Sequence, residues 1–356
     1  MGKYSFKKLK RKILSRHLWL ARLSVFMATA FVFAVLTLGT YELLKLTPLG
    51  KYIKLGKNFI SPAVSEIKSA NRRTNVLILG KAGEGHTAPD LTDTIIMFSV
   101  ILEENKSQID MVSLPRDIWL SDLEAKLNSV YYWGEKRQEG GGLVLAKSTV
   151  EQIMGVPIHY AVVLDFNGFK EIINLMEGVE VQVQKSFTDD LFPIQGKEND
   201  LCDGDPNYSC RYETIKFEEG RQYMDGETAL KFVRSRHSED LAEGTDFARS
   251  ARQQALIKAI QDKLLSREML TQPRKLWKVW QQGNAMVETD LTDQQKAILG
   301  RFIYNARENA NTHSFPEDLL KLASLSGEFK NLYALSPVAG EDDWSEVQAW
   351  VQRILE

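Results

Sequence analysis

The alternation of short apolar runs with segments of helical periodicity is the feature that most constrains the fold of this chain. Strands covered on both faces have such runs, and strands alternating with helices predict an α/β fold with a sheet flanked by helices. The predicted strands are Thr74–Leu79, Thr94–Leu102, Ile109–Leu114, His159–Leu164 and Val179–Val183, and the helices between them are Gly141–Met154 and Phe166–Met176.

The C-terminal half continues the pattern with less regular spacing. Residues 186–222 form a long polar insertion that contains both cysteines. Helices are predicted over Pro273–Gln282 and Thr292–Asn309, and the tail from Phe329 predicts a closing strand and helix.

An uncharged stretch near the N-terminus predicts a membrane anchor. Leu23–Tyr41 contains 19 residues without a charge, and a helix of that length spans roughly 28 Å, close to the thickness of the hydrocarbon core. Residues 1–22 carry eight Lys and Arg side chains and no acid. The positive-inside rule therefore predicts a single-pass membrane protein with a cytoplasmic N-terminus and an extracytoplasmic body. A cleaved signal peptide is the alternative, but the apolar run is long for one.

The charge of the body is acidic. The whole chain carries −2 and residues 1–22 carry +8, so the remainder carries −10. Proteins that bind nucleic acids usually present a basic surface to the phosphates. We therefore expect no nucleic-acid partner.

The two cysteines of the chain lie close together in the insertion. Cys202 and Cys210 stand in the turn-rich segment LCDGDPNYSC. In an extracytoplasmic body we expect them to form a disulfide, with two free thiols as the alternative.

An arginine-rich segment, Gly226–Lys263, suggests a binding site for anions. On a helical wheel at about 100° per residue, Asp246, Arg249 and Gln253 lie on one stripe, which Ile257 and Ile260 continue. The stripe therefore faces the protein. Arginines that face inward need anionic partners, and their planar donors suit phosphates. A structural network of arginines and aspartates is the alternative. The segment brings together Arg234, Arg236, His237, Arg249, Arg252 and Gln253.

Polar residues also stand at the ends of the predicted strands. Asp93 precedes the second strand, and Arg116 and Asp117 follow the third in SLPRD. Ligand sites of open α/β sheets gather at strand ends. A carboxylate that binds a divalent cation, together with arginines that neutralise phosphate charge, would suit a phosphorylated substrate.

Taken in order, these motifs resemble one family, the LytR–CpsA–Psr proteins. The resemblance covers roughly residues 74–310 and implies a central mixed β-sheet flanked by helices, preceded by one transmembrane helix. It also implies a phosphotransferase that moves a glycopolymer, such as teichoic acid or capsular polysaccharide, from a polyprenyl-pyrophosphate carrier to peptidoglycan. The motifs are NVLILG, LTDTIIMFSV, IDMVSLPRD, KLNSVYYWG, HYAVVLDFNGFKEIINLMEGVEV, MDGETALKFVRSRH and TDFARSARQQ.

The resemblance also implies roles for single residues. Asp93 is the expected ligand of Mg²⁺ or Mn²⁺, and Arg116 is expected at the pyrophosphate. Asp246 and Asp117 are candidates to deprotonate the acceptor hydroxyl or to orient an arginine. The further residues expected to catalyse the transfer or bind the phosphates are Lys126, Arg234, Arg236, Arg249, Arg252 and Gln253.

The chain departs from the family pattern in the loop after the first strand. Ala82 stands where many members have an aspartate, which leaves the second metal ligand open. Leu91 stands where many have an arginine, and Lys81 is its candidate replacement. The candidates for the second ligand are Glu84, His86 and Asp90.

Two other functions remain open: a non-catalytic sensor that binds polyprenyl phosphates and regulates envelope synthesis, or a polyprenyl-pyrophosphate hydrolase.

The expected organisation of the chain follows from the predicted anchor and the resemblance. The expected parts are a cytoplasmic tail (1–22), a transmembrane helix (23–41), a stalk (42–73), a catalytic domain (74–310) and an extension packed on that domain (311–356).

Overall fold

The computed structural model describes residues 55–83, 88–103, 106–197, 199–235, 238, 243–244, 246–306 and 309–356. The expected tail, transmembrane helix and first part of the stalk lie outside these residues. None of the helices among them has the length and apolar character needed to cross a membrane. The chain divides into two compact units, residues 1–63 and 64–356. In the first, the described part contains a short helix over residues 55–60.

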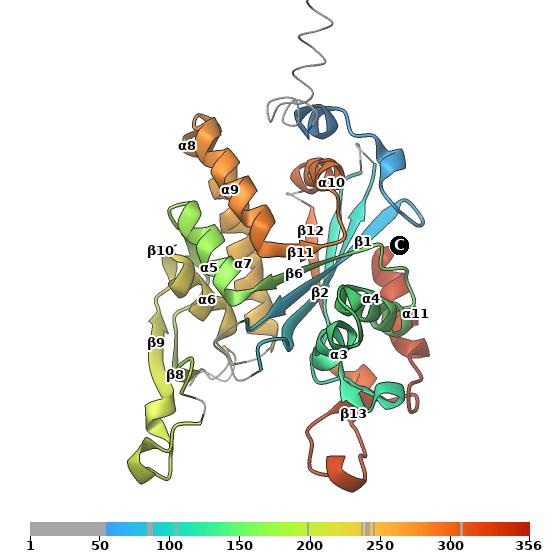
Figure 1. The fold of residues 1–356 in the computed structure, drawn as a ribbon, viewed down its shortest axis with the longest axis vertical. Coiled ribbons are helices and arrows are strands. Elements are labelled where there is room, and N and C mark those ends of the chain that lie inside the picture. Colours follow the sequence, from blue (N-terminus) through green and yellow to red (C-terminus); the bar gives the residue numbers. More distant parts are fainter. Residues whose placement is uncertain are drawn as a thin grey trace, which may run out of the picture. The chain divides into compact units, whose positions relative to one another are not determined.

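The second unit is built on a six-stranded mixed sheet (Figure 1). Its strand order is β11-β6-β1-β2-β3-β12. The β1–β6 and β3–β12 pairs are parallel and the other pairs are antiparallel. The α/β fold predicted from the sequence is thereby confirmed. The strands are β1 (Arg73–Lys81), β2 (Thr92–Ile101), β3 (Ile109–Ser113), β6 (Tyr160–Asp165), β11 (Val287–Thr289) and β12 (Ala310–Ser314).

Both faces of this sheet are covered, as the continuous apolar runs predict. Leu77 and Met97 lie on the face that packs against α3 (Val130–Arg137), α4 (Gly141–Met154) and α11 (Ser345–Leu355). Val76 and Ile96 lie on the opposite face, against α10 (Asp293–Asn305). Figure 1 shows α4 and α11 side by side, with α10 on the other side of the sheet.

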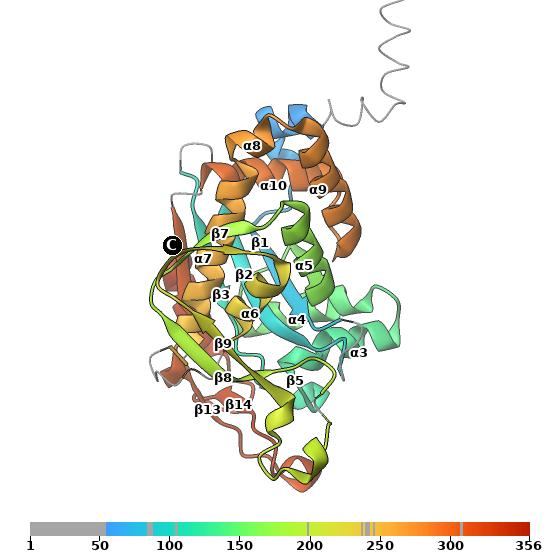
Figure 2. The ribbon, with the colours of Figure 1, turned by 90° about the vertical axis from the view of Figure 1, so that its left-hand side faces the viewer.

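A second layer packs beside the sheet around its own apolar cluster. It contains the strand pair β7–β10 and the hairpin β8–β9. Figure 2 shows β8 and β9 side by side. The strands are β7 (Val179–Val183), β8 (Phe187–Pro193), β9 (Tyr212–Phe217) and β10 (Gly220–Met224). The helices are α5 (Phe166–Leu175), α6 (Gly226–Arg234), α7 (Asp246–Leu264), α8 (Arg267–Leu270) and α9 (Pro273–Met286).

Smaller elements complete the unit. Two short hairpins pair β4 (Trp119–Leu120) with β5 (Ala125–Lys126) and β13 (Leu320–Leu322) with β14 (Leu335–Pro337). The 3₁₀-helices are η1 (Val64–Glu66), η2 (Ser121–Leu123), η3 (Leu127–Ser129), η4 (Cys202–Gly204), η5 (Ser209–Arg211), η6 (Glu317–Leu319) and η7 (Gly327–Phe329).

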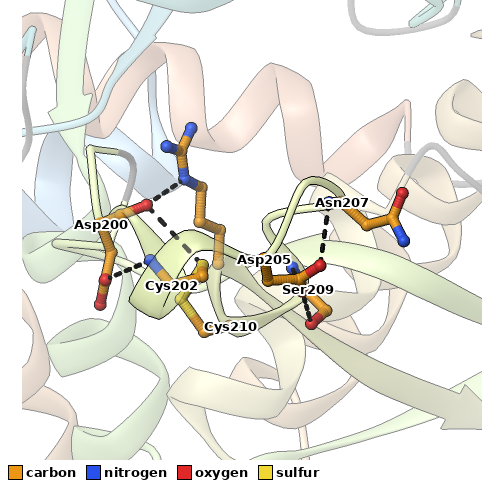
Figure 3. Close-up of a disulfide and its surroundings, with 7 residues drawn as sticks. Asp200, Cys202, Asp205, Asn207, Ser209 and Cys210 are labelled. Carbon is orange, nitrogen blue, oxygen red and sulfur yellow. Dashed lines mark hydrogen bonds between the residues drawn. A yellow bond between two sulfur atoms is a disulfide. The ribbon is translucent and has the colours of Figure 1, made fainter.

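The expected insertion folds as the β8–β9 hairpin, whose far end is closed by a disulfide. Cys202 and Cys210 are bonded, as Figure 3 shows, eight residues apart in sequence. Around them, Asp200 accepts a hydrogen bond from the backbone of Cys202, and Asp205 accepts one from the backbone of Asn207. The loop is therefore held by a covalent bond and by local hydrogen bonds.

Two element predictions differ from the structure. The helix expected over Thr292–Asn309 ends at Asn305, and the strand β12 follows it. Residues 310–314 therefore belong to the central sheet, next to β3. The helix α3 was not predicted at all, although its first five residues, VYYWG, belong to the KLNSVYYWG motif.

Candidate active site at one edge of the sheet

The strand directions bring the predicted site residues to one edge of the sheet. β1, β3 and β6 run the same way, so their C-terminal ends meet there, and antiparallel β2 begins there. Lys81 at the end of β1 is in register with Thr92 on one side and with Asp165 on the other. Asp93 and Arg116 are therefore neighbours in space, although 23 residues separate them.

Arg116 lies between two carboxylates. Its Nη1 forms a short ion pair with Oδ1 of Asp93, and its Nε donates to Oδ2 of Asp117 at 3.4 Å. Burial alone would lower the pKa of Arg116, but the nearby Asp93 and Asp117 outweigh burial and raise it. The side chains of Arg116 and Asp93 remain 34% and 33% exposed. The pair is thus held in place and still open to a ligand.

The segment after β3, which includes the β4–β5 hairpin, places a second cation beside this pair. Nζ of Lys126 donates to Oδ1 of Asp117 at 2.7 Å. Backbone hydrogen bonds hold this segment closed, since Asn128 donates to the carbonyl of Arg116 at 3.1 Å. Asp117 therefore orients both Arg116 and Lys126.

A third cation, Lys81, lies at the end of β1. Its Nζ forms an ion pair with Asp90 at 3.0 Å and lies 5.2 Å from the ring centre of Tyr131. The hydroxyl of Tyr131 donates to Glu288 on β11 at 2.5 Å. Burial, and then the contact with Glu288, raises the pKa of Tyr131 far above its usual value. Tyr131 therefore stays neutral, and Asp90 is engaged by Lys81.

Arg234, at the end of α6, reaches the same edge. Its guanidinium lies 4.3 Å from the ring centre of Phe166, the first residue of α5. Phe166 follows Asp165, whose side chain caps α5 by accepting from the amide of Gly168. Phe166 also packs against Ala82, the residue after β1. Arg234 therefore lies beside the ends of β1 and β6.

The loop that leaves β1 passes directly over Asp165. Gly83 has a φ of +80°, and a Cβ at this position would lie 2.9 Å from the Cβ of Asp165. Only glycine adopts this conformation so close to another residue without strain. The close approach keeps the start of the loop at the edge that carries the cations.

The predicted residues on α7 divide into two groups. Arg249 and Gln253 lie one turn apart and are half-buried. Arg252 is buried and donates from Nη1 to the carbonyl of Ser235 at 2.8 Å, and it pairs with Glu243 at 3.3 Å. The guanidinium of Arg252 therefore bonds to other residues of the protein, Ser235 and Glu243. The side chain of Asp246 and the whole of Arg236 lie outside the described residues.

A cavity of about 320 Å³ lies between α7, the end of β7 and the start of β8. Arg252 and Glu243 are among its polar lining residues. Most of its exposed lining is apolar, and the apolar lining residues are Val183, Phe187, Phe232, Ala248, Ala251 and Ala255.

Comparison with known families identifies the chain. The LytR_cpsA_psr family model matches residues 51–335. The chain belongs to the LytR–CpsA–Psr family. The resemblance inferred from the ordered motifs is thereby confirmed.

Two curated relatives within this family have a described activity. The chain is 26% identical over 296 residues to the polyisoprenyl-teichoic acid–peptidoglycan teichoic acid transferase TagV of Bacillus subtilis, and the match covers 79% of this chain and 65% of TagV. It is 29% identical over 198 residues to TagU of Enterococcus faecalis, which carries the same description, with 54% of each chain covered. The chain thus spans about two thirds of the length of TagV and about half that of TagU.

Solved structures of the LytR–CpsA–Psr type share the fold. The crystal structure of TagV from Bacillus subtilis matches with a TM-score of 0.53 at 23% identity, covering 81% of this chain and 98% of TagV. The Lin1025 protein from Listeria innocua matches with a TM-score of 0.52 at 21% identity, covering 80% of this chain and 97% of that protein. These likenesses show the mixed sheet flanked by helices.

The departure from the LytR–CpsA–Psr pattern at Ala82 has a visible packing consequence. Ala82, where the resemblance implied an aspartate in many members, is buried with Phe166 and Leu230. Of the candidates for a second metal ligand, Asp90 pairs with Lys81. Glu84 and His86 lie outside the described residues.

The described residues offer one carboxylate, Asp93, at the expected metal position. Within them, the group of potential metal ligands that lie close enough to share an ion is Asp200, Cys202 and Cys210. The sulfurs of that group are joined in the disulfide and are not thiolate ligands. Mg²⁺ is usually held by one or two carboxylates together with substrate phosphates and water. Asp93 fits a substrate-bridged Mg²⁺ of this kind and does not fit an all-protein cage.

Several residues of the site were not predicted from the sequence. Tyr131 contacts Lys81 and donates to Glu288. Asp165 caps the N-terminus of α5, whose first residue is Phe166. Asp165 follows a strand and precedes a helix, which is a recognisable capping position. Tyr131 and Glu288 have no such local signal, because 157 residues separate them.

Proposed function

We propose that the chain is a membrane-anchored phosphotransferase. It moves a glycopolymer from a polyprenyl-pyrophosphate carrier to peptidoglycan or another cell-envelope acceptor and forms a phosphodiester. The observation that carries this proposal is the convergence of Arg116, Lys126, Lys81 and Arg234 on the sheet edge that carries Asp93. The teichoic acid transferase activity described for TagV and TagU supports it.

The cations suit the chemistry of phosphoryl transfer. A hydroxyl oxygen of the acceptor attacks the phosphorus next to the glycopolymer, and the bond from that phosphorus to the bridging oxygen breaks. Polyprenyl phosphate leaves with the electron pair of that bond, and the hydroxyl proton is released to a base or to solvent. Negative charge spreads over the phosphate oxygens as this happens, and fixed guanidinium and ammonium groups stabilise it.

The carboxylates near the cations have an orienting role in this proposal. Asp117 accepts from both Arg116 and Lys126, so its oxygens are occupied by the groups that would bind phosphate. Asp93 pairs with Arg116, and it is the residue that would hold Mg²⁺ when the donor is bound. Mg²⁺ at Asp93 would supply further neutralisation of phosphate charge.

The lipid part of the donor needs an apolar surface. The cavity lined by Val183, Phe187, Phe232 and the alanines of α7 offers one beside Arg252. A prenyl chain gains about 0.8 kcal/mol for each buried CH₂ group. We propose this cavity as part of the prenyl-binding groove, with the predicted anchor at Leu23–Tyr41 holding the body near the lipid.

The test is a transfer reaction with the purified full chain. The donor is a synthetic polyprenyl-pyrophosphoryl glycan, the acceptor is a peptidoglycan oligomer, and parallel reactions contain Mg²⁺ or EDTA. A phosphodiester-linked product that forms with Mg²⁺ and not with EDTA is the expected result. Glycan monophosphate without linked product would instead assign a hydrolase. Tight donor binding with no turnover would assign a sensor.

A further inference from the structure

Ser235 is the residue between the two arginines of the RSR motif. It follows the last residue of α6, Arg234, and its amide still donates to the carbonyl of Lys231 at 3.1 Å. Its exposed fraction is 1%. Both the side-chain hydroxyl and the backbone carbonyl of Ser235 are hydrogen-bonded to other elements.

The hydroxyl is held from the β8–β9 hairpin. Oγ of Ser235 donates to Oδ2 of Asp189 at 2.7 Å, and Oδ1 of Asp189 accepts from the amide of Leu191 at 3.1 Å. Asp189 is fully buried. Its backbone also forms a β-bridge with Ser238, two residues after Arg236. The hairpin therefore pairs with the chain on both sides of Arg236.

The carbonyl is held from α7. Nη1 of Arg252 donates to it at 2.8 Å, and the guanidinium of Arg252 lies 4.0 Å from the ring centre of Phe187 on β8. Arg252 is 5% exposed. Ser235 is thus fixed by a buried anion from one element and a buried cation from another.

Such a network is a poor way to gain stability. Taking charges out of water costs free energy, and apolar replacements of buried ionic groups are often neutral or stabilising. What the network does supply is a fixed position for the backbone between the arginines. The hydroxyl, the carbonyl and the neighbouring bridge leave Ser235 little freedom to shift.

We propose that Asp189 and Arg252 are positioning residues that hold Ser235, and through it direct the preceding residue, Arg234, toward the pyrophosphate of the donor. This inference rests on the proposed function. The inserted hairpin then takes part in the reaction, because Asp189 on its strand β8 acts through Ser235 on Arg234.

The test compares Ser235→Ala with a matched serine. Ser99 is also buried, and it accepts from Arg73, which pairs with the buried Asp110. Ser99 lies six residues along β2 from Asp93, roughly 20 Å away along the strand. Ser99→Ala thus removes a hydroxyl from a similar network away from the site. Asp189→Asn is a second variant, because its single side-chain oxygen can accept from Ser235 or from the amide of Leu191 but not from both.

The measurement is the affinity of each full-length variant for farnesyl pyrophosphate and for farnesol, together with its thermal unfolding. Ser235→Ala is expected to bind the pyrophosphate about tenfold more weakly, which corresponds to about 1.4 kcal/mol, and to bind farnesol as the wild type does. Asp189→Asn should show a loss of the same kind, and Ser99→Ala should bind both ligands normally.

Two results would overturn the inference, and they are distinguishable. If the wild type prefers the pyrophosphate and both Ser235→Ala and Asp189→Asn keep that preference in full, the positioning role is wrong. If the wild type itself shows no preference for farnesyl pyrophosphate over farnesol, the proposed function is wrong and the inference fails with it.

Discussion

At the scale of single residues, the site is a set of cations already paired with carboxylates. Arg116 contacts Asp93 and Asp117, and Lys126 contacts Asp117. Ion pairs that remain a third exposed contribute little to stability because water screens them. Their value lies in fixing the direction of the donors before an anion arrives.

We expect Arg116→Ala to lower the transfer rate by about 100-fold or more, since removing one fixed donor to the transition state commonly costs that much. The rate is measured at saturating donor, with thermal unfolding as the check on folding. Arg72→Ala serves as the control, because Arg72 is 77% exposed and pairs with Glu103 at the opposite end of β1. Equal rates for the two variants would argue against a role of Arg116 in transfer.

The sequence allowed part of this residue-level picture to be predicted. Asp93, Arg116 and Lys126 were expected near one another, and the structure brings them together. Asp189 was not expected, because its partner Ser235 lies 46 residues away and nothing local distinguishes a buried aspartate from an exposed one. Arg252 was expected at the substrate, whereas its guanidinium bonds to Ser235 and Glu243.

At the scale of elements, the local sequence determines some helices, whereas tertiary contacts determine others. The helix α4 begins and ends as predicted, because its apolar spacing is regular and Gly155 ends it in the left-handed conformation. The helix α3 has aromatic and β-branched residues with low helix propensity. It forms because Gly134 lets it pack closely on α4, where a Cβ would lie 2.5 Å from the carbonyl oxygen of Gly141.

The strand β12 was missed for a related reason. Its sequence, ANTHS, has little of the apolar character that marks a buried strand. It is held by pairing with β3 and by the contacts of Asn311 and His313 with the buried Asp110. The partner strand therefore decides its structure.

The junction between β1 and β6 predicts a pH dependence of stability. Nδ1 of His159 accepts a hydrogen bond from the amide of Asn75 at 3.0 Å, which requires the unprotonated ring nitrogen. Burial lowers the pKa of His159; Glu151 opposes this, and Lys68 and Lys147 add to the lowering.

Because the folded pKa lies below the unfolded value of about 6.5, the unfolded chain takes up this proton first. The contribution of His159 is complete above pH of about 6.5 and is lost as the pH falls through the folded pKa. Urea unfolding should therefore show that the free energy of unfolding decreases as the pH is lowered from about 7 to about 5. In His159→Asn, whose Oδ1 can accept from Asn75, this slope should be smaller; an unchanged slope would rule out His159 as its source.

At the scale of the whole molecule, the central sheet supports the site because both of its faces are buried. Leu77, at the centre of β1, is fully buried. We expect Leu77→Ala to lower the free energy of unfolding by about 2–5 kcal/mol, as other buried Leu→Ala changes do. Leu322→Ala, at a residue that is 64% exposed, should change it by less than about 0.5 kcal/mol. Denaturant unfolding measures both, and equal losses would contradict the assigned core.

The strand order also governs how the chain can be synthesised. β1, β2, β3 and β6 are complete once residue 165 has left the ribosome. The two outermost strands, β11 and β12, pair with β6 and β3 and come from residues 287–289 and 310–314. A nascent chain therefore carries two unpaired outer strands from the completion of β6 at Asp165 until β11 forms at Val287–Thr289, and unpaired strands can pair with other chains. Fragments that end after Arg252 but before β12 should aggregate, although they contain Asp93, Arg116 and every predicted arginine of the site.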